Sequence, residues 1–266
     1  MTKKKEKKEK PKIEIKWKTA AQVYEERKDV KRVPTGTPID ELIGGGIEQG
    51  EVIEFYGEYG SGKTQLCNTL ICNITGDVIY IDTENTFKPE RLHEIASNRG
   101  LDPEAILKRV HLIQPLTSSE QAEAINQIPE NIIPQLIIID SLMTLYREEY
   151  IGRGTLAERQ GLVRQHIRTL KDYARKNKTA IIVTNQVYAT PDASPFLPLE
   201  YREQAVGGHT VYHSIDNRIF IRKAKQGTRI AKLMDSSMHP PGERLFKITE
   251  KGVESTQQKE EEENAK

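Results

Sequence analysis

Gly57-Glu58-Tyr59-Gly60-Ser61-Gly62-Lys63-Thr64 decides the fold, because it has the spacing G-x-x-x-x-G-K-[ST] of a phosphate-binding loop. An apolar run, Val52 to Tyr56, precedes it, and a helix-like stretch, Gln65 to Ile74, follows it. In that context the glycines let backbone N–H groups turn toward phosphate oxygens, and the helix adds the positive end of its dipole. The alternative is a glycine-rich turn that only joins a strand to a helix, and the complete pattern in this context disfavours it.

Length and composition limit the class of protein. The chain has 266 residues, 30% of them charged and 6% aromatic, with a net charge of +1. We therefore expect one soluble α/β domain with a core that needs no disulfides. A net charge this close to zero indicates neither nucleic acid nor a membrane as the binding partner. Cys67 and Cys72 match neither a C-x-x-C redox pair nor a zinc half-site, so they are expected to be free and buried. Because no signal peptide or membrane-spanning apolar run is recognisable, a cytoplasmic location is expected.

Charge is concentrated at the two ends. Residues 1–12 hold seven Lys and two Glu, and Glu260 to Glu263 form an acidic run. Neither end shows an apolar period, so both are predicted to be disordered tails. The basic tail could touch nucleic acid, but a solvated tail is the preferred interpretation. Trp17, which follows the basic tail, could anchor in its own core or dock on a neighbouring subunit.

Between the tails, apolar runs of strand length alternate with helix-like stretches. This alternation predicts an α/β fold with a mostly parallel central sheet flanked by helices and antiparallel strands at the C-terminal edge. The Ser118 helix has a capping-box pattern from Ser118 to Gln121. The expected strands are Val78–Asp82, Val110–Ile113, Leu136–Asp140, Ala180–Thr184, Arg218–Ile221, Ile230–Met234 and Leu245–Ile248, and the expected helices are Ala21–Lys28, Ile39–Ile43, Pro89–Asn98, one from Pro103, one from Ser118 and Leu156–Lys178.

Carboxylates follow two of these strands, at the edge where such sheets bind ligands. Asp140 is predicted to hold Mg²⁺, directly or through water, opposite the Thr64 hydroxyl. Lys63 is predicted to reach the β- and γ-phosphates of a nucleotide. Glu84, in Asp82-Thr83-Glu84, is the candidate that orients and deprotonates the attacking water. The alternative for Glu84 is a solvent-exposed acidic turn.

Two long polar stretches, Tyr146–Glu158 and Tyr188–Gly208, follow strands at the same edge. Structureless loops of that length are usually functional or disordered. Arginines and aromatics beside glycines suit phosphate contact and base stacking on single strands, although acids in both stretches weaken the electrostatic case for DNA. The candidate DNA-binding residues are Arg147, Tyr150, Arg153 and Gly154 in the first stretch, and Tyr188, Arg202, Gly207 and Gly208 in the second, which also contains the aromatics Phe196 and Tyr201.

From about Trp17 to Val253 the chain resembles the RecA-like recombinases, most closely the archaeal RadA proteins and their eukaryotic strand-exchange relatives. The resemblance rests on the phosphate loop with Gln65-Leu66 and on several further blocks. These blocks are Tyr80-Ile81-Asp82-Thr83-Glu84-Asn85-Thr86-Phe87, Tyr150-Ile151-Gly152-Arg153-Gly154-Thr155-Leu156-Ala157-Glu158-Arg159-Gln160, Thr184-Asn185-Gln186-Val187, Gly207-Gly208-His209 and Arg229-Ile230-Ala231.

The resemblance implies a DNA-dependent ATPase that binds ATP and Mg²⁺ and forms filaments on single-stranded DNA. Glu84 matches the catalytic glutamate of that family. Gln186 matches the glutamine that senses the γ-phosphate and links it to the second DNA loop. His213 matches a histidine that couples nucleotide state to DNA. Arg91 matches an arginine that packs on adenine.

The resemblance also implies how subunits and DNA are held. Trp17 and Ala20 resemble the aromatic-x-x-Ala polymerisation motif, and Asp235 resembles a residue that caps the ATP of a neighbouring subunit, where potassium could join Mg²⁺. The two polar stretches then correspond to the two DNA loops, the second with Gly207 and Gly208. The expected organisation is a disordered basic tail (1–12), a polymerisation and linker segment (13–32), a RecA-like ATPase core (33–254) and a disordered acidic tail (255–266).

Three departures from the family pattern bear on activity. Only 16 residues precede Trp17, so the helical N-terminal DNA-binding domain of full-length members is not expected. Tryptophan stands at residue 17 where phenylalanine is usual. Thr190 and Ser237 replace a common arginine and a common proline, and the second DNA loop is a few residues longer. These departures weaken the inference that the chain carries out strand exchange more than the inference that it binds ATP.

Three functional hypotheses follow. The leading one is an ATP-driven recombinase core that binds single-stranded DNA and pairs it with a homologous duplex. The second is a RadA paralog that acts as a mediator or assembly factor with weak ATPase activity, forming rings or small complexes with recombinase partners. The third is a RecA-fold signalling ATPase with no role on DNA, which the glycines around Arg153 and the pair Gly207 and Gly208 disfavour.

Overall fold

The computed structural model describes residues 17–189, 194, 196 and 202–256, in two compact units that divide between Lys31 and Arg32. The described part of the first unit is built around α1 (Ala20–Arg27), which begins with a capping box between Thr19 and Gln22. Trp17 is 90% exposed within the described residues. The predictions for residues 1–16, Thr190, Tyr201 and 257–266 lie outside the described residues.

The second unit is organised on a mixed sheet. Over residues 32–189 and 202–256, the sheet has nine strands in the order β13-β12-β11-β10-β3-β7-β6-β4-β5. Strands β10, β3, β7, β6, β4 and β5 run parallel, and β10 to β13 pair antiparallel at the other edge. The expected α/β architecture is therefore confirmed. The bounds are β3 (Val52–Tyr56), β4 (Val78–Asp82), β5 (Val110–Ile113), β6 (Leu136–Asp140), β7 (Ala180–Asn185), β10 (Asn217–Lys223), β11 (Thr228–Ser236), β12 (Gly242–Thr249) and β13 (Gly252–Ser255).

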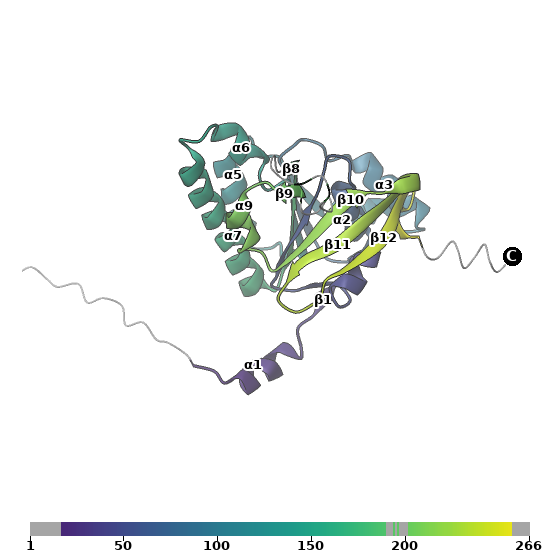
Figure 1. Ribbon diagram of the computed structural model, residues 1–266. Coiled ribbons are helices and arrows are strands. Elements are labelled where there is room, and N and C mark those ends of the chain that lie inside the picture. Colours follow the sequence, from purple (N-terminus) through teal and green to yellow (C-terminus); the bar gives the residue numbers. More distant parts are fainter. Residues whose placement is uncertain (1–16, 190–193, 195, 197–201, 257–266) are drawn as a thin grey trace, which may run out of the picture. The chain divides into compact units, whose positions relative to one another are not determined.

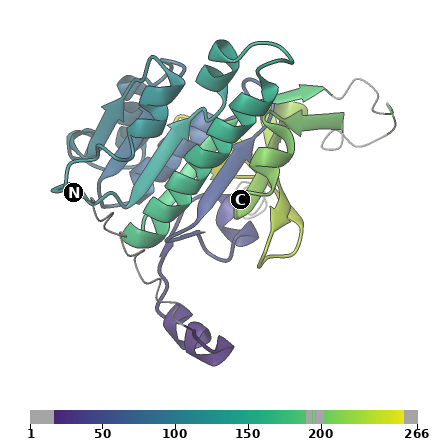
Figure 2. The same ribbon diagram turned by 90° about the vertical axis from the view of Figure 1, so that its left-hand side faces the viewer.

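Helices cover both faces of the parallel strands, as Figure 1 shows. On one face lie α2 (Lys63–Asn73), α3 (Pro89–Asn98) and α4 (Pro103–Lys108); on the other lie α5 (Ser118–Glu123), α6 (Thr144–Glu149), α7 (Leu156–Asn177) and α9 (Gly208–Tyr212). Figure 2 shows the long teal helix α7 lying across its face of the sheet. Successive strand residues alternate between the two cores, because side chains of a strand point to opposite faces. Tyr80 packs under α2 and α3, whereas Ile79 and Ile81 pack on the α7 side.

Strand pairing brings the candidate residues to one edge. Asp82 at the end of β4 lies beside Asp140 at the end of β6, and Tyr56 at the end of β3 lies beside Asn185 at the end of β7. Ligands of open α/β sheets bind outside the carboxyl ends of such strands. No helix of the described residues is long and apolar enough to cross a membrane.

The structure corrects the cap predicted for the Ser118 helix. Thr117, in extended conformation, is the N-cap, and its hydroxyl accepts a hydrogen bond from the Glu120 N–H at 3.1 Å. The Glu120 carboxylate accepts the Leu116 N–H at 2.8 Å. Threonine and serine are both capable caps, and the backbone conformation of Thr117 decides between them. The Leu156 helix ends at Asn177, because Lys178 adopts a left-handed φ of 53°.

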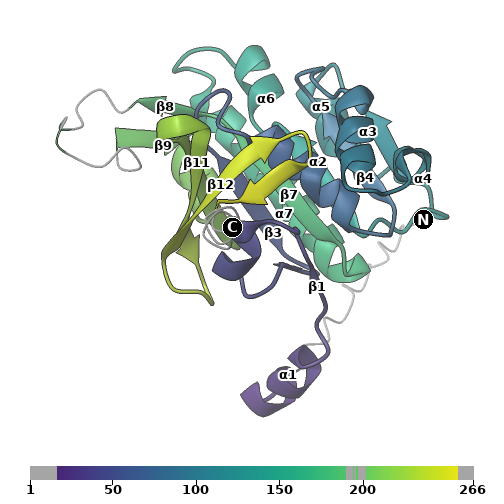
Figure 3. The same ribbon diagram turned by 90° about the vertical axis from the view of Figure 1, so that its right-hand side faces the viewer.

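The described parts of the two polar stretches contain more regular structure than the sequence predicts. Helix α6 covers the start of the first stretch, which leaves a loop of residues 150–155 before α7. In the second stretch, β8 (Val187–Ala189) pairs antiparallel with β9 (Glu203–Ala205), and Figure 3 shows this pair projecting from the body. Further elements that the sequence did not predict are β1 (Arg32–Val33), β2 (Ile47–Glu48), the turn η2 (Lys225–Gly227) and β13; the short helix expected at Ile39–Ile43 is the 3₁₀ helix η1 (Pro38–Leu42).

Candidate nucleotide-binding site

The phosphate loop lies between β3 and α2, and its glycines are required by its surroundings. A Cβ on Gly57 would lie 1.9 Å from the backbone oxygen of Ile221 on β10, so only glycine lets the two strands approach. Gly62, the N-cap of α2, has a φ of 112°, which L side chains rarely adopt. The first N–H groups of α2 have no intrahelical acceptor and face the loop end of the helix, which is an anion-binding arrangement.

Lys63 is the first residue of α2, and its ammonium group closes the loop. Nζ donates to the carbonyl oxygens of Gly57 at 2.9 Å and Glu58 at 3.0 Å. Burial lowers the pKa of Lys63, while the nearby carboxylates of Asp140 and Glu84 act in the opposite direction. Ser61 adds a buried hydroxyl that finds no hydrogen-bond partner among the described residues. An ammonium group, free helix N–H groups and an unpaired hydroxyl form a donor set that suits phosphate oxygens.

Asp140 is held by hydroxyl groups from three elements. Its Oδ2 accepts hydrogen bonds from Thr64 Oγ1 at 2.7 Å and Tyr80 Oη at 2.8 Å. Its Oδ1 accepts a hydrogen bond from Thr184 Oγ1, at the end of β7. The carboxylate is 4% exposed. Asp140 and Thr64 therefore lie opposite each other, as the sequence predicted from residues far apart in the chain.

The donor set around Thr64 and Asp140 fits Mg²⁺. Among the described residues, no group of three or more His, Cys, Asp or Glu side chains could hold a metal ion by itself. Magnesium does not need such a cage, because it binds through one or two protein oxygens and keeps waters and substrate phosphates as its other ligands. Thr64 would supply the hydroxyl ligand, and Asp140 would hold the ion directly or through water.

Glu84 lies two residues beyond the end of β4, and three side chains bond to one of its oxygens. Oε1 accepts hydrogen bonds from Ser141 Oγ at 3.0 Å, Thr144 Oγ1 at 2.9 Å and Gln186 Nε2 at 3.0 Å. The side chain is half-buried and lines the cavity described below. The structure thus brings Glu84 and Gln186 together and adds two hydroxyls that the sequence did not indicate.

Buried polar groups fix the turn that carries Glu84. The Asp82 carboxylate accepts hydrogen bonds from the backbone N–H groups of Thr86 at 3.1 Å and Phe87 at 3.0 Å. Thr83 Oγ1 donates to the carbonyl oxygen of Ser141 and accepts from its N–H, both at 2.8 Å. The turn after β4 is therefore tied to the turn after β6, so Glu84 and Ser141 keep a fixed relation.

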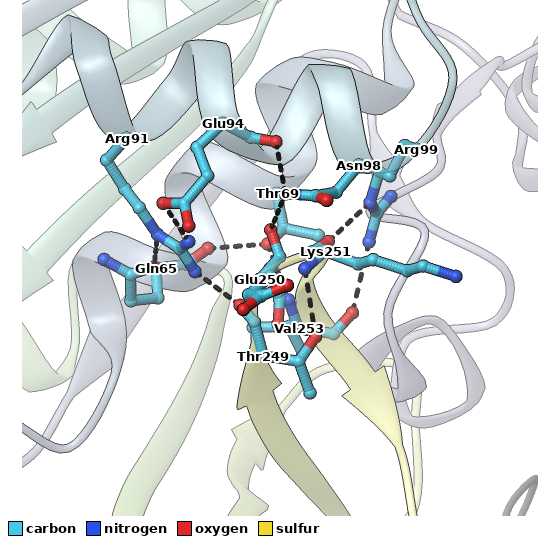
Figure 4. A network of polar contacts seen from close by, with 11 residues as sticks. Gln65, Thr69, Arg91, Glu94, Asn98, Arg99, Thr249, Glu250, Lys251 and Val253 are labelled. Atoms are coloured by element: carbon cyan, nitrogen blue, oxygen red, sulfur yellow. Dashed lines mark hydrogen bonds and ion pairs between the residues drawn. The ribbon is translucent and has the colours of Figure 1, made fainter.

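Arg91 on α3 forms the other end of the site, as Figure 4 shows. Its guanidinium donates to Gln65 Oε1 at 2.9 Å, to Glu94 Oε2 at 2.6 Å and to the carbonyl oxygen of Thr249 at 2.5 Å. These three bonds hold the guanidinium plane between α2, α3 and the end of β12. A fixed planar cation is suited to stack on a base.

These residues surround one cavity of about 510 Å³. A volume of this size suits a small-molecule ligand. Its lining also includes Arg229 on β11 and Ile248 on β12, so the antiparallel edge of the sheet contributes one wall. The lining residues are Tyr59, Gly60, Gly62, Lys63, Thr64, Gln65, Glu84, Thr86, Arg91, Asp140, Ser141, Thr184, Gln186, Arg229 and Ile248.

Four of the candidate DNA-binding residues line a second cavity of about 450 Å³, which we call the loop cavity: Arg147, Tyr188, Gly207 and Gly208. Arg159 and Gln160 of α7 share its wall. Tyr188 is 45% exposed, and its hydroxyl donates to Gln204 Oε1 at 3.0 Å. The two polar stretches thus meet beside α6 and α7.

Other candidates lie outside these two cavities. Arg153 and Gly154 are exposed in the loop between α6 and α7, whereas Tyr150 is half-buried and packs against the core under α7. Arg202 has a buried Nε that finds no partner among the described residues. His213 is exposed and makes an edge contact with Tyr212 at 4.9 Å between ring centroids. Trp17 and Ala20 lie in the first unit.

Asp235 lies on β11, where its backbone pairs with that of Arg218 on β10. It does not line the 510 Å³ cavity of its own chain. A role on a nucleotide held by a neighbouring subunit is compatible with this position.

Several functional side chains were not found from the sequence. The sequence places Tyr80 and Thr184 in apolar strands and in two blocks of the resemblance, but it indicates no role for their hydroxyls. These hydroxyls reach Asp140 because β4 and β7 flank β6. The sequence assigns no role to Thr144. A polar residue inside an otherwise apolar strand, close to the ligand edge, is the signal that could have indicated Tyr80 and Thr184.

The comparison with protein families agrees with this geometry. A family model described as Rad51 matches residues 26–256 of the chain. The matched residues include the phosphate loop, Glu84, Asp140, both polar stretches and Asp235.

Proposed function

The chain belongs to the Rad51 family of RecA-like recombinases, and from this membership we propose that it is an ATP-dependent recombinase core. It binds single-stranded DNA as a filament and pairs that strand with a homologous duplex in recombinational repair. ATP, with Mg²⁺, holds the active filament, and hydrolysis to ADP and phosphate releases it. Likeness to the archaeal RadA proteins in particular remains our prediction.

One observation supports this proposal above the others. The Gln186 side chain donates to Glu84 Oε1 at 3.0 Å, and the next residue begins β8, which enters the second DNA loop. The group proposed to act on water and the segment proposed to hold DNA are thus one hydrogen bond apart. An ATPase without a role on DNA has no need of this contact.

The site residues have separate tasks in this proposal. Lys63 and the N-terminus of α2 bind the β- and γ-phosphates, and Arg91 stacks on the base. Glu84 orients the attacking water and takes its proton while the water oxygen bonds to the γ-phosphorus and the bond from the γ-phosphorus to the β–γ bridging oxygen breaks, which releases ADP. Bound Mg²⁺ would neutralise charge on the phosphate oxygens. Arg147, Tyr188, Gly207 and Gly208 hold single-stranded DNA at the loop cavity, together with Arg153, Gly154, Tyr150 and Arg202.

Assembly completes the site. Trp17 and Ala20 dock on a neighbouring subunit, and Asp235 covers the nucleotide of the adjacent subunit. His213, which follows α9, reports the nucleotide state to the second DNA loop. The phosphate loop then belongs to an assembly switch as well as to a hydrolytic centre.

Steady-state ATP hydrolysis with and without single-stranded DNA, over a salt series, tests the proposal. We expect stimulation by single-stranded DNA and loss of turnover in Lys63→Ala. The stimulation should weaken as salt weakens DNA binding. The logarithm of the DNA-binding constant should fall linearly with the logarithm of the salt concentration, with a slope of about −0.7 per phosphate contacted. Unchanged turnover with single strands, together with absent strand exchange, would contradict the recombinase function. Small complexes instead of long filaments in electron micrographs with ATP and single-stranded DNA would favour a mediator.

A further inference from the structure

The three hydrogen bonds to Glu84 all reach the same oxygen. Ser141, Thr144 and Gln186 contact Oε1, and Oε2 accepts no hydrogen bond from the described residues. Because the side chain lines the nucleotide cavity, the orientation of the carboxylate plane decides where Oε2 meets water. The donors on Oε1 therefore control the geometry of the proton acceptor.

The two hydroxyls on Oε1 also contact each other, at 2.7 Å between Ser141 Oγ and Thr144 Oγ1. Each hydroxyl carries one proton, so two protons serve three contacts. Either both hydroxyls donate to Glu84, or one donates to the other, which alone donates to Glu84. A small rotation of either hydroxyl thus changes how firmly Oε1 is held.

The two hydroxyls are anchored differently. Ser141 is buried, and its backbone is tied to Thr83 at the end of β4 by two bonds of 2.8 Å. Thr144 is half-buried and is the first residue of α6. Ser141 therefore belongs to the rigid strand ends, whereas Thr144 moves with α6.

Helix α6 leads directly into the first DNA loop. It has six residues, about 9 Å of helix. At its far end the Glu149 carboxylate accepts hydrogen bonds from the N–H of Ser118, at 2.7 Å, and from its hydroxyl. The Tyr150 carbonyl oxygen then accepts a hydrogen bond from Arg159 Nη1 at 3.2 Å, at the start of the loop. A shift of this loop thus reaches Thr144 through one short helix.

We propose that Thr144 is a positioning residue for Glu84, and that α6 makes this positioning responsive to DNA held by the first loop. The inference rests on the proposed function, because it takes Glu84 as the proton acceptor and residues 150–155 as a DNA contact. It adds a second route from DNA to the hydrolytic centre, beside the one through Gln186.

Thr144→Val tests the proposal, because valine keeps the shape of threonine and removes the hydroxyl. A hydrogen bond to a charged group is strong enough that its loss should lower DNA-stimulated kcat about 10-fold. The KM for ATP should stay within about twofold, since Thr144 touches no phosphate-binding residue. The ratio of stimulated to basal kcat should fall, and Thr144→Ser should restore it. Thr169→Val, which removes the hydroxyl of a half-buried α7 residue that donates to the Gln165 carbonyl oxygen, is the matched control and should behave as wild type.

The outcomes separate this inference from the proposed function. Wild-type kcat and stimulation in Thr144→Val would overturn the inference and leave the DNA-stimulated ATPase standing. An equal fall in basal and stimulated kcat would overturn the link through α6. A wild-type chain with ATP turnover that DNA does not stimulate would overturn the link, and with absent strand exchange it would also overturn the proposed function, while a lowered kcat in Thr144→Val would still support positioning. Thermal unfolding of each variant shows whether a loss of kcat comes from loss of fold.

Discussion

Carboxylates at the ends of two neighbouring strands, β6 and β4, are hydrogen-bonded in different ways. At the end of β6, both oxygens of Asp140 are occupied by hydroxyls, two of them at 2.7 and 2.8 Å. Beyond the end of β4, all the hydrogen bonds that described residues make to Glu84 reach Oε1. Asp140 is buried, whereas Glu84 is half-buried on the cavity wall.

This difference assigns different chemistry to two groups of one type. A carboxylate that accepts three hydrogen bonds over its two oxygens keeps one of about four lone-pair sites, so it can orient a metal ion or its water but has little capacity left for a reacting proton. A carboxylate held by one oxygen is fixed in orientation and keeps the other oxygen for water. The predictions below test this division, and each would fail if the two carboxylates were equivalent.

Glu84→Gln should have the largest effect. Glutamine keeps the shape of the side chain and cannot take a proton, so kcat for ATP should fall by about 10²- to 10⁴-fold. Nucleotide affinity, measured with a fluorescent ATP analogue, should change only a few-fold, because Glu84 is not a phosphate ligand. Glu90→Gln, an exposed carboxylate on α3, is the matched control. Turnover close to wild type in Glu84→Gln would show that Oε2 is not the proton acceptor.

Asp140→Asn should act on the metal rather than on the proton. Groups that orient a metal ligand typically contribute about 10- to 100-fold to metal affinity. We therefore expect the Mg²⁺ concentration for half-maximal ATP hydrolysis to rise by that factor, with partial recovery of kcat at high Mg²⁺. Glu84→Gln should leave this midpoint unchanged. If Asp140→Asn lowers kcat at every Mg²⁺ concentration without shifting the midpoint, the division between the two carboxylates is wrong.

The sequence predicted both carboxylates and only part of what surrounds them. Asp140 and Glu84 could be found because each follows an apolar run of strand length, and such runs end at the ligand edge of a parallel sheet. A polar residue near the ligand edge of an apolar strand can mark Tyr80 and Thr184 as candidates, but the partner of each hydroxyl, like that of Thr144, depends on which strands become neighbours. That order is a property of the whole sheet and is not encoded near any one of these residues.

The fold, like the site, could be predicted only in part from the sequence. Strand and helix positions follow from periodicity, and the parallel core follows from their alternation. The pairing of β8 with β9 could not be predicted, because it joins residues on either side of a long polar stretch with no apolar period. The cap of α5 was misplaced by one residue, since Thr117 and Ser118 have the same capping chemistry and differ only in backbone conformation.

Tyr80→Phe should have the smallest effect, because it removes one of several donors to Asp140 and leaves the Thr64 bond to the same oxygen in place. We expect kcat within a few-fold of wild type and a loss of about 1 kcal/mol of unfolding free energy near neutral pH. Burial, reinforced by the Asp140 charge, raises the pKa of Tyr80 well above its usual value of 10. The folded chain therefore keeps this proton above pH 10, whereas the unfolded chain releases it.

The pH dependence of unfolding makes this prediction specific. A raised pKa in the folded state stabilises the fold fully below pH 10, and this contribution is lost as pH rises, at up to about 1.4 kcal/mol per pH unit for one proton. The stability difference between wild type and Tyr80→Phe should therefore shrink, and then reverse, in urea unfolding between pH 8 and 11. Tyr24→Phe, which changes an exposed tyrosine of α1, should show no such trend. A constant difference across this range would mean that Asp140 does not depend on a buried, protonated Tyr80, and that its two oxygens are less fully engaged than those contacts indicate.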